Sequence, residues 1–274
     1  MDVSDFVIHT HRSTLRPLTV VDSDEVAERV LADPHVTKTL VDDWSSIEKC
    51  QANAREWIES SQTWNERRYG IWGVYVESGR FGDERGLVGI AAASEELPEI
   101  GEGPEIYYAF RRSTWGCGLG TEVTVALLQF LFHSSGVSAV EALYYPHINP
   151  ASLRIAERLG FRFVTHYPFL EYIDGDHRPT VRFDLWLIAH PDNPASVNEL
   201  TSAATRIGMC VGEGGETFET MQSAILKAAR LGGFVNQLGA ARVERTIGEA
   251  LKRGMDCTGF LVYRLRRADF KERP

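Results

Sequence analysis

The residues best suited to chemistry are three glycines at alternate positions in one short segment, Trp115-Gly116-Cys117-Gly118-Leu119-Gly120-Thr121. Glycine has no Cβ, so successive backbone N–H groups in such a loop can converge on one anion. Apolar residues recur at helical spacing directly after the loop, and the N-terminus of a helix attracts negative charge. Arg111 and Arg112 add positive charge just upstream. The segment is therefore predicted to bind a phosphate or pyrophosphate group.

Other interpretations of these glycines are weaker, although a Gly-x-Gly-x-Gly run also occurs in ordinary tight turns. A dinucleotide-binding loop follows the first strand of a βαβ unit and is followed, about 20 residues on, by an acidic residue. Four strand-like segments precede this loop, and the lysine of a P-loop is missing. The pattern therefore favours another kind of phosphate site.

Strand-like and helix-like segments alternate over the first 190 residues, which is typical of an α/β (α+β) protein. Strands are expected at 7–18, 69–76, 86–94, 105–110, 138–144, 162–172 and 182–189, the last two joined by a turn at Asp174-Gly175-Asp176. Helices are expected from Asp22 or Ser23, over 46–65, after the glycine loop, and from Asn149-Pro150 to Gly160. The last of these has typical start and stop residues.

Pro191-Asp192-Asn193-Pro194 interrupts this alternation. We therefore expect one domain over residues 1–190 and a mainly helical C-terminal segment over 195–274. Within that segment, helices are expected at 196–209, 216–231 and 240–253, and a strand at 259–265. Its role as a lid, a dimerisation element of a homodimer or a separate binding module stays open.

The stretch Glu105–Thr121, EIYYAFRRSTWGCGLGT, resembles the GNAT superfamily of N-acetyltransferases, and most of all the branch of ribosomal-protein N-terminal acetyltransferases. Trp115, the three glycines, Thr121 and Glu122 match that branch, whereas Tyr107 replaces a glycine. A second block from Asn149 through Ser152 to Gly160-Phe161 resembles the Asn-x-x-Ser…Leu-Gly-Phe helix of the same branch. The resemblance covers residues 7–190 and implies a mixed, mostly antiparallel sheet flanked by helices.

The resemblance implies that the domain binds acetyl-coenzyme A (acetyl-CoA) between the strands 105–110 and 138–144, without a metal. Backbone N–H groups from Gly116 to Thr121 would hold the pyrophosphate, beside Trp115, Arg111 and Arg112. The pantetheine arm would contact Asn149 and Ser152, although Asn149 would serve equally as a helix cap. The backbone partners of the pantetheine amides would be Tyr108, Ala109 and Phe110.

Catalysis in this family is direct transfer, in which an uncharged amine attacks the thioester and the thiolate leaves. Many relatives use a tyrosine as proton donor to the thiolate, but Ala156 stands at that position. In the resembling branch a serine takes the role, and Ser152 matches it. Glu105 is the candidate general base, with lesser candidates at Glu95, Glu171, His147 and His166. Four tryptophans fall where the family builds its acceptor pocket and are expected mainly in packing: Trp44, Trp57, Trp64 and Trp72.

The amino-acid composition limits the classes of binding partner and the cellular location that we expect. The formal net charge of -9 argues against a nucleic-acid partner and suits a cationic acceptor, such as a protein N-terminus or a small-molecule amine. The start of the chain lacks the features of a signal peptide, and no apolar run has membrane-spanning length, so a cytoplasmic location without membrane contact is expected. The four scattered cysteines predict free thiols and no zinc site.

An N-acetyltransferase is the leading functional interpretation of this sequence. The alternative from another class is a non-catalytic acyl-CoA-binding regulatory protein, because Tyr144 stands where some relatives place a glutamate as the general base. A donor other than acetyl-CoA is the third, since the bulky Tyr107 replaces a small family residue near the expected thioester.

Overall fold

The computed structural model describes residues 3–37, 40, 44–77, 79–96, 101–144, 149–173, 176–180 and 259–271. The chain divides into two compact units. The first consists of Met1–Leu143, Ala151–Phe163 and Tyr263–Pro274, and the second of Tyr144–Pro150 and Val164–Val262. Among the residues predicted to do chemistry, Asn149 belongs to the second unit and the main candidates Ser152 and Glu105 to the first.

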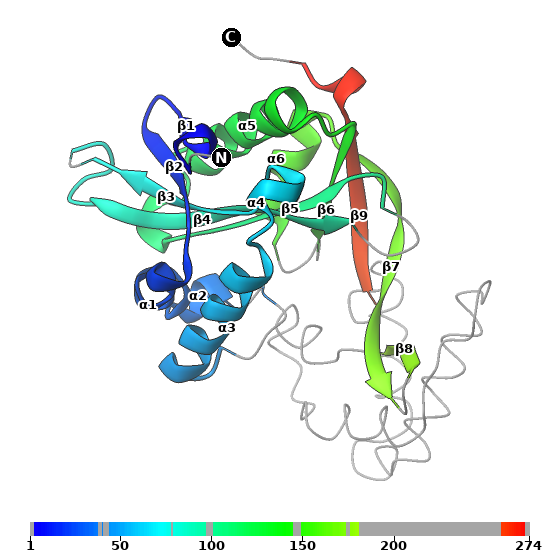
Figure 1. The fold of residues 1–274 in the computed structure, drawn as a ribbon, viewed down its shortest axis with the longest axis horizontal. Coiled ribbons are helices and arrows are strands. Elements are labelled where there is room, and N and C mark those ends of the chain that lie inside the picture. Colours follow the sequence, from blue (N-terminus) through cyan, green and yellow to red (C-terminus); the bar gives the residue numbers. More distant parts are fainter. Residues whose placement is uncertain are drawn as a thin grey trace, which may run out of the picture. The chain divides into compact units, whose positions relative to one another are not determined.

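The first unit is built on a mixed sheet (Figure 1). Six strands follow one another in chain order: β1 (Ile8–His9), β2 (Ser13–Pro17), β3 (Ile71–Val76), β4 (Gly86–Glu96), β5 (Pro104–Phe110) and β6 (Ala139–Tyr144). The strands β1 to β5 pair antiparallel, whereas β5 and β6 run parallel. The first-unit part of β9 (Gly259–Arg266) comes next, followed by the start of β7 (Arg162–Ile173). The predicted mixed, mostly antiparallel sheet is confirmed.

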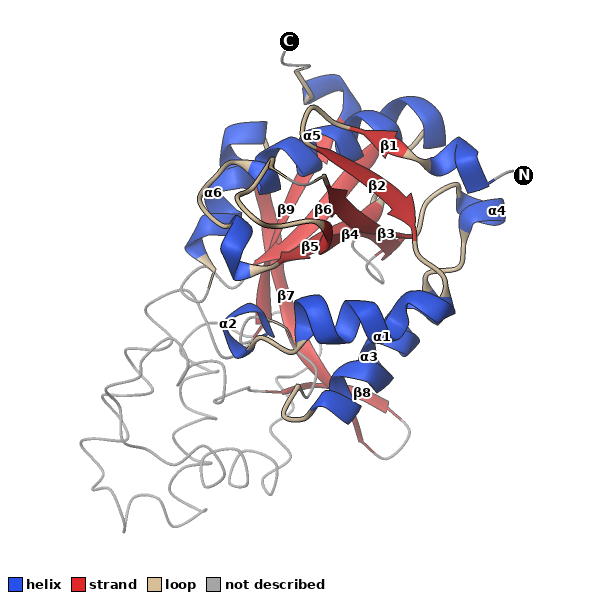
Figure 2. Cartoon of the chain, turned by 90° about the vertical axis from the view of Figure 1, so that its left-hand side faces the viewer, coloured by secondary structure: helices blue, strands red, loops and turns tan. Residues whose placement is uncertain are grey.

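Helices cover both faces of this sheet (Figures 1 and 2). One face carries α5 (Leu119–Phe130), continued by a π-helical turn over Leu131–Ser135, and α6 (Pro150–Leu159). The other face carries α1 (Ser23–Val26), a π-helical turn over Ala27–Leu31, α2 (Pro34–Thr37) and α3 (Ile47–Ser60). The three-layer arrangement places the glycine loop between β5 in the sheet and α5 on the face that it covers.

Each helical layer buries an apolar core against the sheet. Under α1 and α3 the fully buried side chains include Val30, Ile58 and Ile90. Under α5 the indole of Trp72 lies 5.6 Å from Phe130, ring centre to ring centre, and is fully buried. These two cores fix β5, because its successive side chains point alternately into each of them.

Two predicted elements are each divided in the structure. The strand predicted over 7–18 is a hairpin, because Thr10 turns the chain by hydrogen-bonding Ser13 through its hydroxyl group. The helix predicted over 46–65 ends at Ser60 and is followed by the short α4 (Trp64–Arg67). Ser46 caps α3 by accepting a hydrogen bond from the Lys49 N–H, as its position before the helix indicates.

The second unit contributes the hairpin of β7 and β8 (Asp176–Thr180), in which Ile173 pairs with Asp176. The strand predicted over 182–189, the three helices predicted between 196 and 253, and the domain boundary predicted near 190 lie outside the described residues. The strand predicted at 259–265 is present as β9, and its residues from Tyr263 onward belong to the first unit.

Two absences hold for the described part of the chain. None of its helices combines the length and the apolar character needed to cross a membrane. Nor do its histidine, cysteine, aspartate and glutamate side chains form a group of three that could hold a metal ion.

Candidate active site

The glycine loop has the backbone conformation that its sequence requires. A 3₁₀ turn over Arg112–Thr114 leaves β5, and Gly116 and Gly118 then adopt φ angles of 74° and 85°. Residues that carry a side chain are strained in this left-handed region, whereas glycine is not. Gly118 is also the N-cap of α5, so the loop passes directly into the helix.

The N–H and C=O groups of the loop are used very differently. The carbonyl groups of Thr114, Cys117 and Gly118 accept hydrogen bonds from the Cys117 thiol, the Arg12 guanidinium and the Glu122 N–H, respectively. Within the described residues, by contrast, no backbone N–H from 116 to 121 donates a hydrogen bond. Six successive donors at the positive end of a helix are therefore available to an anion, which is the cradle that a pyrophosphate needs.

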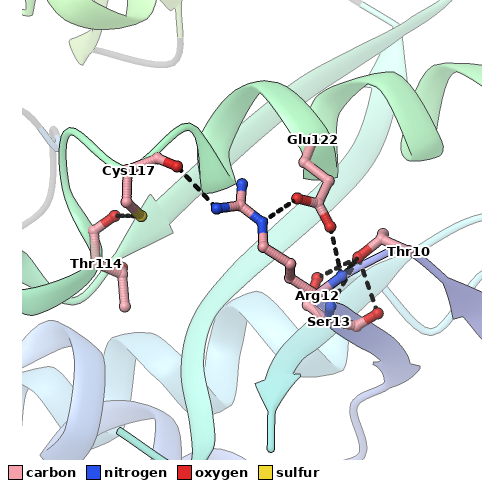
Figure 3. A network of polar contacts seen from close by, with 6 residues as sticks. All are labelled: Thr10, Arg12, Ser13, Thr114, Cys117 and Glu122. Carbon is pink, nitrogen blue, oxygen red and sulfur yellow. Dashed lines mark hydrogen bonds and ion pairs between the residues drawn. The ribbon is translucent and has the colours of Figure 1, made fainter. Parts of the chain in front are cut away.

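Arg12 and Glu122 brace this loop (Figure 3). The N–H and Nε of Arg12 donate to the two carboxylate oxygens of Glu122, at 2.7 and 2.6 Å. Its Nη1 donates to the Cys117 carbonyl oxygen at 2.9 Å. Burial opposes ionisation of Glu122, but the hydrogen bonds with Thr10 and Arg12 and the Arg12 charge lower its pKa below the usual value.

The structure adds Arg158 to the two cations that the sequence suggested near the cradle. Arg111 lies 3.3 Å from the Glu84 carboxylate, which offsets its charge, and Arg112 is exposed. Arg158, in the last turn of α6, instead donates from Nη2 to the Thr121 hydroxyl at 3.3 Å. Sequence reasoning missed Arg158 because the only signal is its helical position, one turn after Arg154 and ahead of Gly160.

The strands β5 and β6 are in register at one described residue pair, Glu105 opposite Glu141. The Arg111 N–H bonds the Val88 carbonyl on β4, so by alternation Ala109 also turns its backbone groups toward β4. The backbone groups of Tyr108 and Phe110 consequently face away from β4, on the β6 side, where no described residue pair continues the ladder. Of the three residues predicted to pair with pantetheine, Tyr108 and Phe110 are thus oriented for it.

Ser152 lies against Tyr108 in the structure. Their hydroxyl oxygens are 2.7 Å apart, and either atom could donate. Burial raises the pKa of Tyr108 although hydrogen bonds with Ser152 and Thr124 oppose this, so the phenol keeps its proton at neutral pH. The pair is a chain of two hydroxyl groups on the face of β5 that α5 and α6 cover.

Glu105 lies three residues from Tyr108, so its side chain points to the opposite face of β5. Burial and the nearby Glu141 carboxylate raise the pKa of Glu105 to about 7. The side chain of Glu141 is fully buried, and its Oε1 accepts from Arg264 Nε at 2.7 Å. A carboxyl group that titrates near neutrality can take up or release a proton under physiological conditions.

The four tryptophans divide between the two faces of the sheet. Trp64 and Trp72 are 4.7 Å apart and belong to the core under α5. Trp44, Trp57 and Tyr107 form a chain of edge-to-face contacts on the α3 side, at 5.0 and 5.5 Å, and all three are partly buried. The face of β5 that carries Glu105 therefore also carries Tyr107, at the end of this chain of aromatic rings.

The remaining predicted residues are placed as follows. Trp115 is 48% exposed, and its indole N–H donates to the Phe110 carbonyl at 2.8 Å. Asn149 precedes α6 and is partly buried, and its contact with pantetheine stays a prediction. The lesser base candidates have no described side chain: Glu95, His147, His166 and Glu171.

Comparison with known proteins tests the family resemblance. The model of the acetyltransferase (GNAT) domain matches residues 12–162. The Bacillus subtilis protein YkkB, itself uncharacterised, is 33% identical over 115 residues, which cover 42% of this chain and 64% of YkkB. The chain thus spans less than two thirds of the length of that relative.

Solved structures that superpose on part of the chain include two acetyltransferases. One is a GNAT-family enzyme from Bacillus anthracis (20% identical, 59% of this chain and 86% of that chain, TM-score 0.47). The other is a ribosomal-protein-S5-alanine acetyltransferase from Vibrio fischeri (14% identical, 62% of this chain and 90% of that chain, TM-score 0.47). Because the matched family model spans more than half of the chain and includes both the glycine loop and Ser152, the chain belongs to the GNAT family of acetyltransferases.

Proposed function

We propose that this protein transfers an acetyl group from acetyl-CoA directly to a primary amine. GNAT acetyltransferases are enzymes that transfer acetyl groups. The observation that carries the proposal is the row of six N–H donors from 116 to 121, which have no partner among the described residues. They follow the β5 edge, along which Glu105–Glu141 is the one described residue pair with β6. Together they suit a ligand with a pyrophosphate at one end and amides along a thin arm, which are the features of coenzyme A.

Transfer requires that the amine be uncharged when it attacks the thioester carbonyl. Glu105, with a pKa of about 7, is suited to accept the proton that the amine loses. Its place on the same face of β5 as Tyr107 supports an acceptor that binds on that face. There the partly buried rings of Trp57 and Tyr107 would contact the apolar part of the acceptor.

The leaving thiolate needs a proton as the carbon–sulfur bond breaks. Ser152 is placed to donate its hydroxyl proton and to recover one from Tyr108, whose hydroxyl is 2.7 Å away. The resulting tyrosinate would lie near Arg158, whose positive charge partly opposes the rise that burial causes in the pKa of Tyr108. Base and acid on opposite faces of β5 can act on one thioester held at the edge of the strand.

The acceptor class is a protein N-terminus or the amine of a small molecule. The net charge of -9 supports a cationic acceptor, because acidic surfaces attract ammonium groups and increase their rate of encounter. The same charge opposes a nucleic acid, whose phosphates require basic surfaces.

The test is a turnover assay with acetyl-, propionyl- and butyryl-CoA against a panel of polyamines, aminoglycosides and peptides with free N-termini. Thiol release and mass spectrometry of the product are both followed. We expect amide formation, and a kcat lower by about 10²-fold or more for Ser152→Ala, since general acids contribute about 10²–10⁴-fold. The control variant is Ser113→Ala, because Ser113 is exposed in the 3₁₀ turn between β5 and the glycine loop.

Two results would contradict the proposal. Tight binding of acetyl-CoA without any acylated amine would favour a non-catalytic acyl-CoA-binding protein. Unchanged turnover in Ser152→Ala would remove the proposed proton donor. Faster turnover with a longer acyl-CoA would change the donor and leave the chemistry as proposed.

A further inference from the structure

The residue of interest is Arg12, which nothing in the sequence associates with the glycine loop. It lies in the turn between β1 and β2, 105 residues before Cys117, and its guanidinium reaches the Cys117 carbonyl at 2.9 Å. We propose that Arg12 is a positioning residue that orients the Gly118 N–H into the phosphate cradle. The proposal rests on the proposed function, because it takes the cradle to bind the pyrophosphate of coenzyme A.

The orientation follows from the geometry of one peptide unit. The Cys117 carbonyl and the Gly118 N–H belong to the same planar trans peptide, so they point in opposite directions. Because Arg12 Nη1 holds the carbonyl oxygen, the N–H must point away from Arg12 and out of the brace. Gly118 has a φ of 85°, and without a side chain this peptide could otherwise flip at little cost.

Arg12 is itself held on several sides, as an orienting group must be. Its own N–H and its Nε both donate to the Glu122 carboxylate, and the guanidinium carbon lies 5.0 Å from the centre of the Phe81 ring. Glu122 in turn donates its backbone N–H to the Gly118 carbonyl at 3.1 Å. The two carbonyl groups that flank the Gly118 N–H are therefore held by the Arg12 guanidinium and by the Glu122 backbone N–H.

The ion pair with Glu122 distinguishes the positioning role of Arg12 from direct attraction between the Arg12 charge and the ligand. The carboxylate of Glu122 compensates the Arg12 charge at 2.6 Å, so the ion pair adds little net positive field to the cradle. Arg12 is expected to act through the geometry of two simultaneous hydrogen bonds, from Nε and from Nη1. Lysine, with a single ammonium group, cannot make both in that arrangement.

The experiment is calorimetric titration of four proteins: the unsubstituted chain, Arg12→Ala, Arg12→Lys and the control Arg16→Ala. Arg16 lies on β2 with its guanidinium carbon 3.6 Å from the centre of the Tyr75 ring, away from the loop residues that hold Arg12. The ligands are coenzyme A and dephospho-coenzyme A, which share the pyrophosphate and differ in the 3′-phosphate. Circular dichroism confirms that each variant is folded.

We expect Arg12→Ala and Arg12→Lys each to raise the Kd for both ligands about 10- to 100-fold, the usual effect of losing a hydrogen bond to a charged group. Arg16→Ala should match the unsubstituted chain. With the amine that reacts best in the acceptor panel, the KM for acetyl-CoA should rise likewise, while kcat at saturating donor stays within about threefold. A purely structural defect would lower kcat as well.

Three results would overturn the proposal. An unchanged Kd in Arg12→Ala would show that Arg12 does not position the Gly118 N–H. A normal Kd in Arg12→Lys would show that the positive charge alone is sufficient. A loss that disappears with dephospho-coenzyme A means that Arg12 binds the 3′-phosphate instead. If Arg12→Ala does not fold, Glu122→Gln, which weakens the same brace, is measured in its place. Failure of the unsubstituted chain to bind coenzyme A would contradict the proposed function itself.

Discussion

The guanidinium of Arg264 on β9 donates from Nε to the buried Oε1 of Glu141 on β6 across 2.7 Å, and it joins two strands whose paired residues are 123 positions apart. Arg264 also contacts the Glu102 carboxylate, to which Arg266 is bound as well. Through this network, a strand near the end of the chain belongs to the unit that carries the candidate active site.

Replacing Arg264 with alanine should lower the free energy of unfolding of the first unit. The change leaves the fully buried Glu141 carboxylate without its cationic partner, and breaking a buried pair from one side costs about 3–5 kcal/mol. Urea denaturation followed by tryptophan fluorescence measures the loss. Arg266→Ala is the control, because its exposed pair with Glu102 should contribute about 1 kcal/mol or less. Equal effects of the two variants would mean that burial of the Glu141 pair is unimportant.

Gly118→Ala should weaken both stability and coenzyme A binding. A side chain at a φ of 85° costs about 1–2 kcal/mol, and relaxation of that strain would move the cradle. Gly79→Ala is a matched control in the β3–β4 turn, since Gly79 has a φ of 84° and no atom within 4 Å of the position that a Cβ would take. Thermal unfolding and calorimetry should show similar destabilisation for both, with lost affinity confined to Gly118→Ala. If Gly118→Ala and Gly79→Ala bound coenzyme A with equal affinity, the glycine loop would not be the coenzyme A site.

Glu105 should determine the acid limb of the activity profile. Its carboxylate form is the base, so kcat/KM should rise with pH through about 7, where Glu105 ionises. In Glu105→Gln the limb near 7 should disappear and only the ionisation of the acceptor amine should remain. Rates of the unsubstituted chain and of Glu105→Gln, measured from about pH 5 to about pH 9 with the same amine, show whether the limb near 7 belongs to Glu105. A profile identical to that of the unsubstituted chain would exclude Glu105 as the base.

Ionisation of Glu105 should also make stability depend on pH. Its pKa is raised in the folded state, so between about pH 4.5 and pH 7 the folded protein binds more protons than the unfolded chain. This contribution to stability is therefore lost as pH rises through that range. Denaturation at several pH values should show a smaller decline for Glu105→Gln. If the stability of Glu105→Gln declined with pH as much as that of the unsubstituted chain, the pKa of Glu105 would not be raised in the folded state.

Tyr108→Phe should lower kcat more than it raises the KM for acetyl-CoA. The variant keeps the ring but removes the hydroxyl that lies 2.7 Å from Ser152, so Tyr108 can no longer replace the proton on the serine. We expect a loss of about 10-fold or more, near the lower end of general acid–base effects. Steady-state kinetics beside Ser152→Ala measures it, and the double variant should be little worse than Ser152→Ala alone. Additive losses would show that the two hydroxyl groups act separately.

Much of the site could be predicted because its signals are local. The spacing of Gly116, Gly118 and Gly120 indicated the phosphate loop, and the glycines adopt the left-handed or close-packed geometry that this role requires. The helix from Pro150 to Leu159 was equally evident, since a first-turn proline and the C′ glycine Gly160 mark its ends. Strand positions followed from runs of apolar residues.

The partners of these residues could not be predicted, because they come from distant parts of the chain. Nothing near Arg12 in the sequence indicates the Cys117 carbonyl, and nothing near Glu141 indicates Arg264. The hairpin within residues 7–18 was missed, since a strand-like segment does not reveal a turn formed by the Thr10 and Ser13 hydroxyl groups. Pairing across a sheet depends on topology, which a single sequence does not fix.

The most direct test of the proposed cofactor site is calorimetric titration with acetyl-CoA of the unsubstituted protein and of the double variant Gly118→Glu/Gly120→Glu. The two carboxylates would add negative charge to the loop and repel a pyrophosphate, while circular dichroism verifies the fold. We expect micromolar binding by the unsubstituted protein and none by the variant. No binding by a folded unsubstituted protein, or equal binding by both, would contradict the site.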